Sequence, residues 1–334
     1  MAFANAQVSD LLATTIAARS KKLADNLEHN NALLMKLRQR GNVRPVSGGT
    51  HIMEEIMYDD GDDSSGSYSG YDVIDITPDS PISAAEYDFK QYARAVTISG
   101  LEIIQNAGRE QMIDLLAGRV QAAETRLRNA VSAGLYGDGT GNGGKDITGL
   151  QAAISGTPNS GTYGGIDRAT WAFWRNQLIS CTSDVGAAMS PSTILSGMNK
   201  LALATARGTD RTDLIVADNE AFDYYQSALQ AIQRVTNDSG QGLAGAGFTS
   251  LKYHGAGANA DVIFDGGIGG NMPAKTMHFI NTNYLFFRPH RQRNFVALGN
   301  DRQSVNQDAV VRLIGWAGNL TTSGAQFQGI LVDS

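Results

Sequence analysis

The sequence predicts an α+β fold with segregated helices and antiparallel strands. Three observations lead to this class. Two long amphipathic helical stretches lie within the first 135 residues, short strand patterns dominate the rest of the chain, and helices and strands do not alternate regularly. The 334 residues are enough for one large domain or two closely packed ones.

Composition excludes several classes of protein. With 27 Lys and Arg against 33 Asp and Glu, the net charge of −6 gives no general basic signature of nucleic-acid binding. The single cysteine, Cys181, excludes an intramolecular disulfide and a cysteine metal cluster, and it fits a protein made in a reducing cytoplasm. No run of 18 apolar residues and no basic-then-apolar leader is present, so we expect no membrane segment. Charged residues make up only 18% of the chain, which indicates that partners cover much of its surface.

The first helical stretch covers residues 8–40 and is basic on its polar side. Its apolar positions recur at helical spacing in Val8, Leu12, Ile16, Leu23, Leu27, Leu34 and Leu37. One interpretation is an amphipathic helix packed on its own core. The other is an arm that lies across a neighbouring subunit, with its basic side facing acidic protein or nucleic acid.

An acidic hairpin is predicted at His51–Asp79. Alternation indicates a strand through Ile52 and Ile56 and a returning strand through Ile74 and Ile76, joined by a polar turn over residues 59–70. Residues 51–80 contain nine Asp and Glu and no Lys or Arg. Because an isolated two-stranded ribbon is marginally stable in water, we expect this one to lie on a partner. The candidate interface residues at its tip are Asp59, Asp60, Asp62, Asp63 and Tyr68.

A long helix is predicted at Asn106–Leu135, more than twice the usual length of about 11–12 residues. A strand over residues 87–96 leads into it, and the glycine-rich stretch 134–144 ends it. Its apolar side, from Met112 to Val131, is expected to pack on the closing strands of the same chain. Its candidate interface residues are Arg119, Arg126 and Arg128, which we expect to meet the acidic hairpin of a neighbouring subunit.

The rest of the chain is predicted as short elements. Asp167 is expected to cap a helix that carries Trp171, Trp174 and Leu178, and Ser190 with Pro191 to begin another. A buried strand at 213–217 precedes a helix from residue 219. Further strands are predicted at 249–254, 261–265, 276–280, 283–288, 308–321 and 325–332.

Several motifs suggest chemistry and fail on inspection. Residues 139–146 nearly spell a phosphate-binding loop, but Asp146 stands where the magnesium-binding hydroxyl belongs, and the loop follows a helix where the motif requires a strand. The acidic turn lacks the glycine and closing glutamate of a calcium loop, which favours a solvated charge cluster. The five histidines have no metal-binding spacing, and G-x-S-x-G is absent. We therefore expect no catalytic, cofactor-binding or metal-binding residues.

A basic and aromatic segment, FFRPHRQRNF, covers residues 286–295. Single-stranded nucleic acid could stack on its aromatic side chains. In a chain of net negative charge, pairing with acidic residues of another subunit is the favoured interpretation. The candidate interface residues of this segment are Arg288, Arg291 and Arg293.

The order of these elements resembles the HK97-type major capsid protein of tailed bacteriophages. The most specific stretches are KQYARAVTISGLEIIQNAG, residues 90–108, and YGGIDRATWAFWRNQ, residues 163–177. The region after FRPHRQRNFVAL is a weaker match. The resemblance implies an N-terminal arm at 1–47 and an extended loop at 48–84. It also implies a peripheral domain at 85–211 with its spine helix, an axial domain at 212–300, and returning peripheral strands at 301–334.

The same resemblance implies a non-enzymatic shell protein. It would assemble with itself into hexamers and pentamers of an icosahedral head, assembled in the host cytoplasm, around double-stranded DNA bound without sequence specificity. A separate scaffolding protein, a portal and decoration proteins are the expected further partners. Two alternatives stay open: an encapsulin-type compartment, and a soluble enzyme whose site is assembled from scattered residues.

Two family features are expected to be missing. No lysine lies between Lys36 and Lys90, so the extended loop cannot supply the amine of the covalent crosslink found in some members. With the loop beginning near residue 48, we expect no long cleaved scaffolding segment, and hence a separate scaffold.

Overall fold

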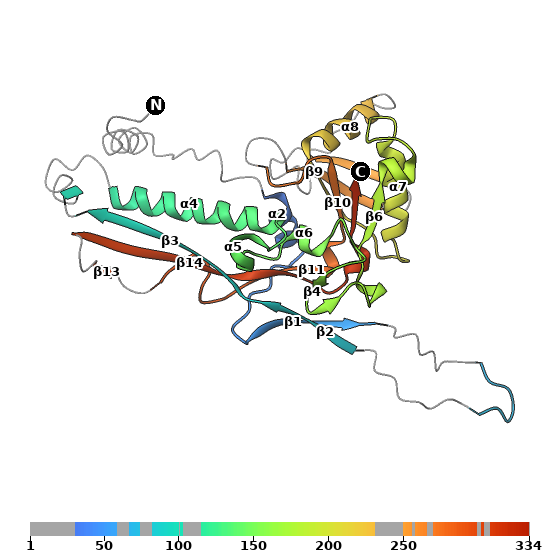
Figure 1. Cartoon of the computed structure of the whole chain (residues 1–334), viewed down its shortest axis with the longest axis horizontal. Coiled ribbons are helices and arrows are strands. Elements are labelled where there is room, and N and C mark those ends of the chain that lie inside the picture. Colours follow the sequence, from blue (N-terminus) through green and yellow to red (C-terminus); the bar gives the residue numbers. More distant parts are fainter. Residues whose placement is uncertain are drawn as a thin grey trace.

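The structure is a computed structural model that describes residues 31–58, 67–73, 82–99, 101–102, 115–230, 250–255, 258–265, 270–298, 302–303 and 308–333. The molecule is elongated. A long helix and two long strands extend to one side of a rounded body, and a two-stranded ribbon lies below them (Figure 1).

A five-stranded antiparallel sheet forms the extended part of the molecule. Its central strand, β14 (Ala309–Thr322), pairs with β3 (Lys90–Ser99) from Ala309 opposite Ser99 to Gly318 opposite Lys90. The remaining strands also pair with β14 and are β11 (Leu285–Pro289), β12 (Val296–Ala297) and β13 (Arg302–Gln303). The pairing of β14 with β3 joins residues more than 200 positions apart in the sequence, so the sheet is held together by long-range contacts.

One face of this sheet is covered by α4 (Leu115–Tyr136). Ala123, Leu127 and Val131 follow one another at four-residue spacing and are buried against the face that carries Val96 and Trp316. The predicted strut helix and its packing on its own closing strands are confirmed for these residues. The predicted start at Asn106 lies outside the described residues.

A six-stranded mixed sheet forms the rounded body, in the order β6-β15-β10-β7-β9-β8. Its strands are β6 (Gln177–Ser180), β7 (Leu214–Ala217), β8 (Ser250–Gly255), β9 (Ala258–Phe264), β10 (Thr276–Ile280) and β15 (Gly329–Val332). β7 runs parallel to β9, and β15 runs parallel to β6. The predicted α+β class is confirmed, but the expectation of purely antiparallel strands was wrong.

Both faces of the six-stranded sheet are covered. One face packs against α7 (Ile194–Thr205) and α8 (Asn219–Gln230) through side chains such as Ile215 and Phe279. On the other face, Leu214 and Val216 share a core with Leu33 and Leu37 of α2 (Ala32–Gln39). The strands therefore read as continuous apolar runs, as expected for a sheet buried on both sides.

The segment 31–46 joins the two parts of the molecule. Asn31 caps α2 and donates through Nδ2 to Ser132 Oγ of α4, at 2.7 Å. Lys36 forms an ion pair of 2.7 Å with Asp261 of β9. After α2, residues 42–46 run parallel to β11, and the backbone of Arg44 donates to Phe287 O at 2.9 Å. The start of the predicted helix, residues 8–30, lies outside the described residues.

The acidic hairpin has a different partner strand from the predicted one. β1 (His51–Met57) pairs with β2 (Ile82–Asp88), from His51 opposite Asp88 to Met57 opposite Ile82. The prediction paired it with a strand through Ile74 and Ile76, which lie outside the described residues. Residues 82–88 are the observed partner strand of β1, and their side chains Ala85 and Tyr87 are buried on the body of the same chain.

The helix predicted around Trp171–Leu178 was wrong as well. Residues 172–174 form a single 3₁₀ turn, and residues 177–180 continue as β6, which pairs in parallel with β15. The remaining short elements are α5 (Gly141–Gly144), α6 (Leu150–Ala153), β4 (Thr162–Tyr163), β5 (Ile166–Asp167), a π-helical turn over residues 181–185, and 3₁₀ turns over residues 282–284 and 325–327.

Candidate functional site

The ribbon β1/β2 packs its inner face on its own chain. Burial alternates strictly along β1, with Ile52, Glu54 and Ile56 buried and the residues between them exposed. Ala85 and Tyr87 of β2 are buried on the same side. The base of the ribbon is therefore covered by the body of its own chain, and its contact with a partner stays a prediction.

A buried ion pair fixes the ribbon to the five-stranded sheet. The carboxylate of Glu54 receives two hydrogen bonds of 2.6 Å from Arg288 Nε and Nη2, and a third of 2.7 Å from Thr321 Oγ1. The Glu54 and Arg288 side chains are only 7% and 17% exposed. Arg288 also lies over the ring of Phe286, at 5.3 Å. A bidentate pair of this kind fixes orientation as well as distance, so it sets the direction in which the ribbon leaves the body.

Tyrosines complete the base of the ribbon. Tyr87 donates its hydroxyl hydrogen to the backbone oxygen of Thr322 at 2.8 Å, and its ring lies 5.3 Å from that of Tyr163 in an edge contact. Burial, with Tyr163 nearby, raises the pKa of Tyr87 well above its ordinary value, so the phenol is neutral. The backbone of Glu86 donates to Gly164 O at 2.9 Å, which ties β2 to the β4–β5 turn.

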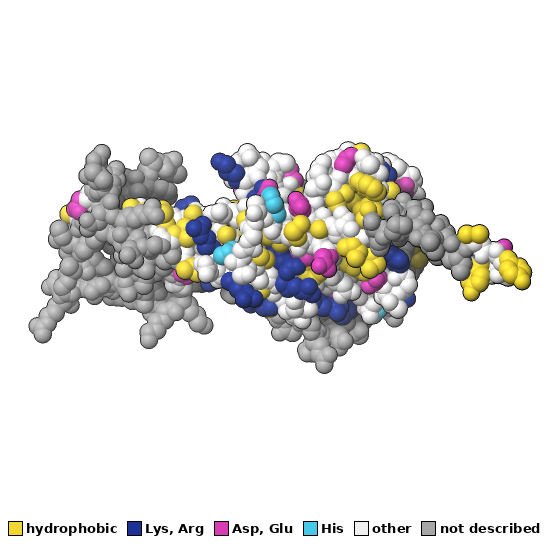
Figure 2. All heavy atoms as spheres, turned by 90° about the horizontal axis from the view of Figure 1, so that it is seen from below, with side chains coloured by type: hydrophobic (Ala, Val, Ile, Leu, Met, Phe, Trp, Pro, Cys, Tyr) yellow, Lys and Arg dark blue, Asp and Glu magenta, His cyan; other side chains and the backbone are white. Residues whose placement is uncertain are grey.

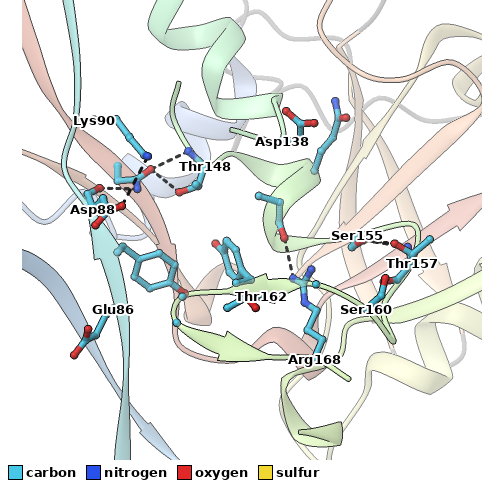
Figure 3. Close-up of a pocket in the computed structure, with 18 residues that line it drawn as sticks. Glu86, Asp88, Lys90, Asp138, Thr148, Ser155, Thr157, Ser160, Thr162 and Arg168 are labelled. Carbon is cyan, nitrogen blue, oxygen red and sulfur yellow. Dashed lines mark hydrogen bonds and ion pairs between the residues drawn. The ribbon is translucent and has the colours of Figure 1, made fainter. Parts of the chain in front are cut away.

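A polar hollow of about 420 Å³ lies beside this base (Figure 3). Lys90, Asp88 and Thr148 stand at one end, and Ser155, Thr157 and Ser160 at the other (Figure 3). Three of its polar groups are used for structure. Lys90 Nζ donates to Gly144 O at 2.7 Å, Thr148 Oγ1 to Asn319 Oδ1 at 2.8 Å, and Arg168 Nη2 to Ala153 O at 2.7 Å.

This hollow holds no arrangement typical of a catalytic site among its described lining residues. Ser155 Oγ lies 3.3 Å from Thr157 Oγ1, and no described carboxylate or imidazole approaches either hydroxyl. Within the described ranges, no group of three His, Cys, Asp or Glu is placed to hold a metal ion.

The described helices include none that is long and apolar enough to cross a membrane.

The outer face of the ribbon is exposed and carries apolar side chains. Met53, Met57 and Ile82 are 59%, 82% and 70% exposed. Glu55 and Glu86 stand among them, also exposed. Large apolar groups standing together on a surface are typical of interaction sites. The chain therefore presents a ribbon that is anchored on one side and open on the other.

The predicted tip residues are only partly described. Asp59, Asp60, Asp62 and Asp63 lie outside the described residues. Tyr68 is described and is 67% exposed. Their role at an interface stays a prediction.

The three arginines predicted on the strut helix differ in their surroundings. Arg119 is engaged within its own chain: it donates to Thr97 O at 2.8 Å and to Glu102 Oε1 at 2.7 Å. Burial acts to raise the pKa of Glu102, but hydrogen bonds from Ser99 and Arg119 outweigh it and lower that pKa. Arg126 and Arg128 are exposed, and the Arg128 guanidinium lies 5.8 Å from the Phe295 ring.

The structure separates the three arginines of the basic segment. Arg288 is held by Glu54 of the same chain. Arg291 and Arg293 are exposed at the turn after β11, where Arg293 Nη1 donates to Gln91 Oε1 at 3.0 Å. A local signal could have identified Glu54, because an acidic residue between Ile52 and Ile56 on the apolar face of a strand needs a buried partner.

Sequence comparisons identify no relative. No protein-family model matches the chain, and no curated protein sequence matches it.

Solved structures share the fold along most of the chain. The capsid asymmetric unit of cyanophage A-1(L) matches with a TM-score of 0.67 at 16% identity, covering 99% of this chain and 99% of that chain. The capsid of the native GTA particle matches with a TM-score of 0.57 at 14% identity, covering 89% of each chain. The SrpI encapsulin complex from Synechococcus elongatus PCC 7942 matches with a TM-score of 0.52 at 9% identity, covering 95% of this chain and 94% of that chain.

The chain therefore has the fold of capsid and encapsulin subunits. The HK97-type fold implied by the sequence resemblance is confirmed.

Proposed function

We propose that this chain is the major capsid protein of a tailed bacteriophage. It assembles into hexamers and pentamers, and these form an icosahedral shell around double-stranded DNA. The observation that carries the proposal is the match to a phage capsid structure over 99% of both chains. The ribbon supports it independently, since its base is locked by the Glu54–Arg288 pair while its outer face is open.

The proposed role is structural and not enzymatic. Many interfaces, each burying about 1,200–2,000 Å², add up to a stable shell through closed symmetry. The partners we propose are further copies of this chain, a separate scaffolding protein, a portal, decoration proteins and packaged DNA. The protein is then found in the virion, after assembly in the host cytoplasm.

Assembly of the purified chain tests the proposal. We expect particles by negative-stain electron microscopy and by size-exclusion chromatography when the chain is expressed with the scaffolding protein of its own phage. A chain that stays at 35.5 kDa under these conditions would contradict the proposal. Boiled particles should give a single band on a denaturing gel, because the loop has no lysine for a covalent crosslink.

The encapsulin compartment is the second candidate, favoured by the match to the SrpI complex. The two functions differ in what the particle contains. Nuclease-protected DNA in purified particles supports the phage head, and a folded protein cargo without nucleic acid supports the compartment.

We also propose that Arg126 and Arg128 meet the acidic loop tip, residues 59–63, of a neighbouring subunit. Their exposure on α4 and the charge of the tip support this pairing. The double variant R126E/R128E should fold, because both side chains are exposed, and should assemble poorly. Normal particles from this variant would refute the pairing.

A further inference from the structure

A buried arginine lines the polar hollow beside the base of the ribbon. Arg168 is only 4% exposed, and its side chain points toward the carboxyl end of α6 (Figure 3). Its Nη2 donates to the backbone oxygens of Ala152 and Ala153, at 2.8 and 2.7 Å. Its Nε is buried, and neither Nε nor Nη1 forms a hydrogen bond with the described residues. The guanidinium therefore has fewer acceptors than donors.

Arg168 also has no anionic partner in the described part of the chain. No carboxylate described there lies within ion-pair distance of its guanidinium. Its contacts are with neutral groups, namely the two backbone oxygens and the ring of Tyr163, whose centroid lies 5.1 Å from Cζ. Burial lowers the pKa of Arg168, with Tyr163 and Tyr87 acting in the opposite direction. Because buried charges in proteins are usually paired, this arginine is suited to bind an anion.

A short loop closes around the arginine. The loop begins after Ala153, whose oxygen accepts from Nη2, and it ends at Gly161, whose oxygen accepts from the Arg168 backbone at 3.0 Å. The hydroxyl side chains of this loop that line the hollow are Ser155, Thr157 and Ser160. Figure 3 shows these three on one side of Arg168. Since a hydroxyl can donate as well as accept, this end of the hollow offers an arginine and three hydroxyl groups to an oxyanion.

The carboxylates that line the hollow lie elsewhere in it. Glu86 and Asp88 stand on the side opposite the hydroxyl loop (Figure 3), and Asp88 lies 3.1 Å from His51. Asp138 accepts a hydrogen bond of 3.0 Å from the backbone of Thr140 in its own turn. These negative charges disfavour a ligand that is anionic along its whole length. They restrict an oxyanion to the end that Arg168 occupies.

The surroundings of the hollow carry positive charge. β4, which borders the hollow, lies on the lower side of the body beside the ribbon (Figure 1). Figure 2 views the molecule from that side and shows Lys and Arg side chains gathered over its middle, with hydrophobic side chains to either side. A positive surface of this kind raises the local concentration of anions.

We infer that this hollow binds a small molecule through one oxyanion, a phosphate or carboxylate group, held by Arg168 and the hydroxyls of residues 155, 157 and 160. Both groups accept several hydrogen bonds, and arginine recognises both. The volume of about 420 Å³ lies within the usual range of about 300–1,000 Å³ for small-molecule sites, so the ligand is larger than its oxyanion. The inference goes beyond the proposed shell function and does not require assembly.

Binding to the unassembled full chain tests the inference. The chain is labelled with ¹⁵N in its arginines and titrated with inorganic phosphate or with acetate, each against chloride at equal ionic strength. We expect the Nε–H resonance of Arg168 to shift with at least one of the two anions. R168Q identifies that resonance by its loss, and calorimetry should show roughly tenfold or more weaker binding, because the amide carries no charge.

Matched variants separate binding from folding. R94Q is the control for a lost arginine, since Arg94 is exposed and does not line the hollow, and its affinity should be unchanged. T157V/S160A covers the case in which R168Q does not fold, because both side chains are exposed. It should weaken binding roughly threefold or more, through the loss of two hydroxyl donors. Equal affinity of this variant and the unchanged chain would overturn the proposed site, as would an Arg168 resonance that neither anion shifts.

The source of the oxyanion follows from the same experiments. A shift with phosphate alone supports a phosphorylated ligand, and a shift with acetate alone supports a carboxylate ligand. A third arm tests a protein-borne carboxylate. Particles of R168K are treated with a carbodiimide, which joins an amine to a carboxylate with no spacer. A crosslink from position 168 to another subunit, with no binding of either anion, would overturn a free ligand and leave the shell function standing.

Discussion

The two sheets of this protein differ in what covers them. The six-stranded sheet has helices α7 and α8 on one face and α2 on the other, and its central strands are buried along their whole length. The five-stranded sheet has α4 on one face and leaves Ala93, Ala95 and Thr97 exposed on the other. The same chain therefore contains one sheet with both faces covered by its own helices and one sheet with an exposed face.

Because of this difference, we expect one sheet to determine the stability of the folded chain and the other to determine what the chain binds. Substitutions in the six-stranded sheet are expected to unfold the subunit before they affect any assembly. Substitutions on the open face of the other sheet are expected to leave the subunit folded and to change only what it binds. Substitutions and changes of pH can test these different roles of the two sheets. The predictions below run from the largest expected effect on the free energy of unfolding to the smallest.

Phe279→Ala in β10 should lower the free energy of unfolding most, by about 4 kcal/mol, because it leaves a cavity in a fully buried site. Chemical denaturation followed by circular dichroism measures the loss. Phe264→Ala in β9 is the matched control, since Phe264 is 44% exposed and should cost less than half as much. Equal losses in the two variants would contradict the proposed difference in burial.

Arg288→Met should cost about 3 kcal/mol, because it leaves the Glu54 carboxylate buried without its partner. The double variant E54Q/R288M should lose less than the sum of its two single variants, since no unpaired charge remains. A double-mutant cycle from urea unfolding curves gives the coupling. Additive losses would show that the pair does not hold the ribbon to the sheet.

Stability should depend on pH through His278 of the buried sheet. Burial lowers the pKa of His278 from 6.5 to about 4, so the unfolded chain binds a proton between these values and the folded chain does not. The free energy of unfolding therefore falls as pH decreases from about 6.5 to about 4. Relative to His278→Leu, the native protein should lose about 2–3 kcal/mol between pH 7 and pH 4.5.

Asp265 provides a control, because its effect on the free energy of unfolding should change with pH in the opposite direction. Burial raises its pKa from 3.8 to about 6, against a smaller lowering by a hydrogen bond from Tyr136. The folded chain then keeps a proton between pH 4 and 6 that the unfolded chain has lost. Relative to Asp265→Asn, the native protein should gain stability over the same fall in pH. If both comparisons change in the same direction, at least one of the two burial assignments is wrong.

Ala95→Glu should change the free energy of unfolding by less than about 0.5 kcal/mol, because Ala95 is exposed on the open face. The same change should reduce particle formation, since it places a carboxylate on the exposed, apolar face of the five-stranded sheet. Ala123→Glu, on the buried side of α4, is the matched control and should unfold the chain. A stable Ala95→Glu variant that forms normal particles would refute the use of this face.

The sequence was sufficient for elements whose burial follows a regular local pattern. The stripe of Ala123, Leu127 and Val131 predicted both the strut helix and the side on which it packs. The run at 213–217 predicted the buried strand that the structure has at Leu214–Ala217, and the helix from residue 219 was predicted from the same kind of pattern.

Errors arose where long-range pairing decided between local alternatives. Local alternation around Ile74 and Ile76 predicted a returning strand there, whereas β1 pairs with residues 82–88, whose Ala85 and Tyr87 are buried on the body. The predicted helix at Trp171–Leu178 gave way to a strand because β15, about 150 residues later, offers a parallel partner.

The candidate site also depends on a contact between residues that are far apart in the sequence. Glu54 and Arg288 are 234 residues apart, and no spacing rule connects them. The basic segment was recognised as a unit, but the fold gives Arg288 to the interior and Arg291 and Arg293 to the surface. That division depends on which of them reaches Glu54 after folding.

The attachment of residues 31–46 has a mechanical consequence for anything bound to the chain before residue 31. A pull from that side reaches the bonds of Asn31 to α4 first, then the ion pair of Lys36, then that of Arg40 with Asp213, and last the strand at 42–46. These attachments are loaded in series, so they yield one at a time and each releases a short length of slack. The segment therefore takes up a pull in small steps before residues 42–46 are peeled from β11.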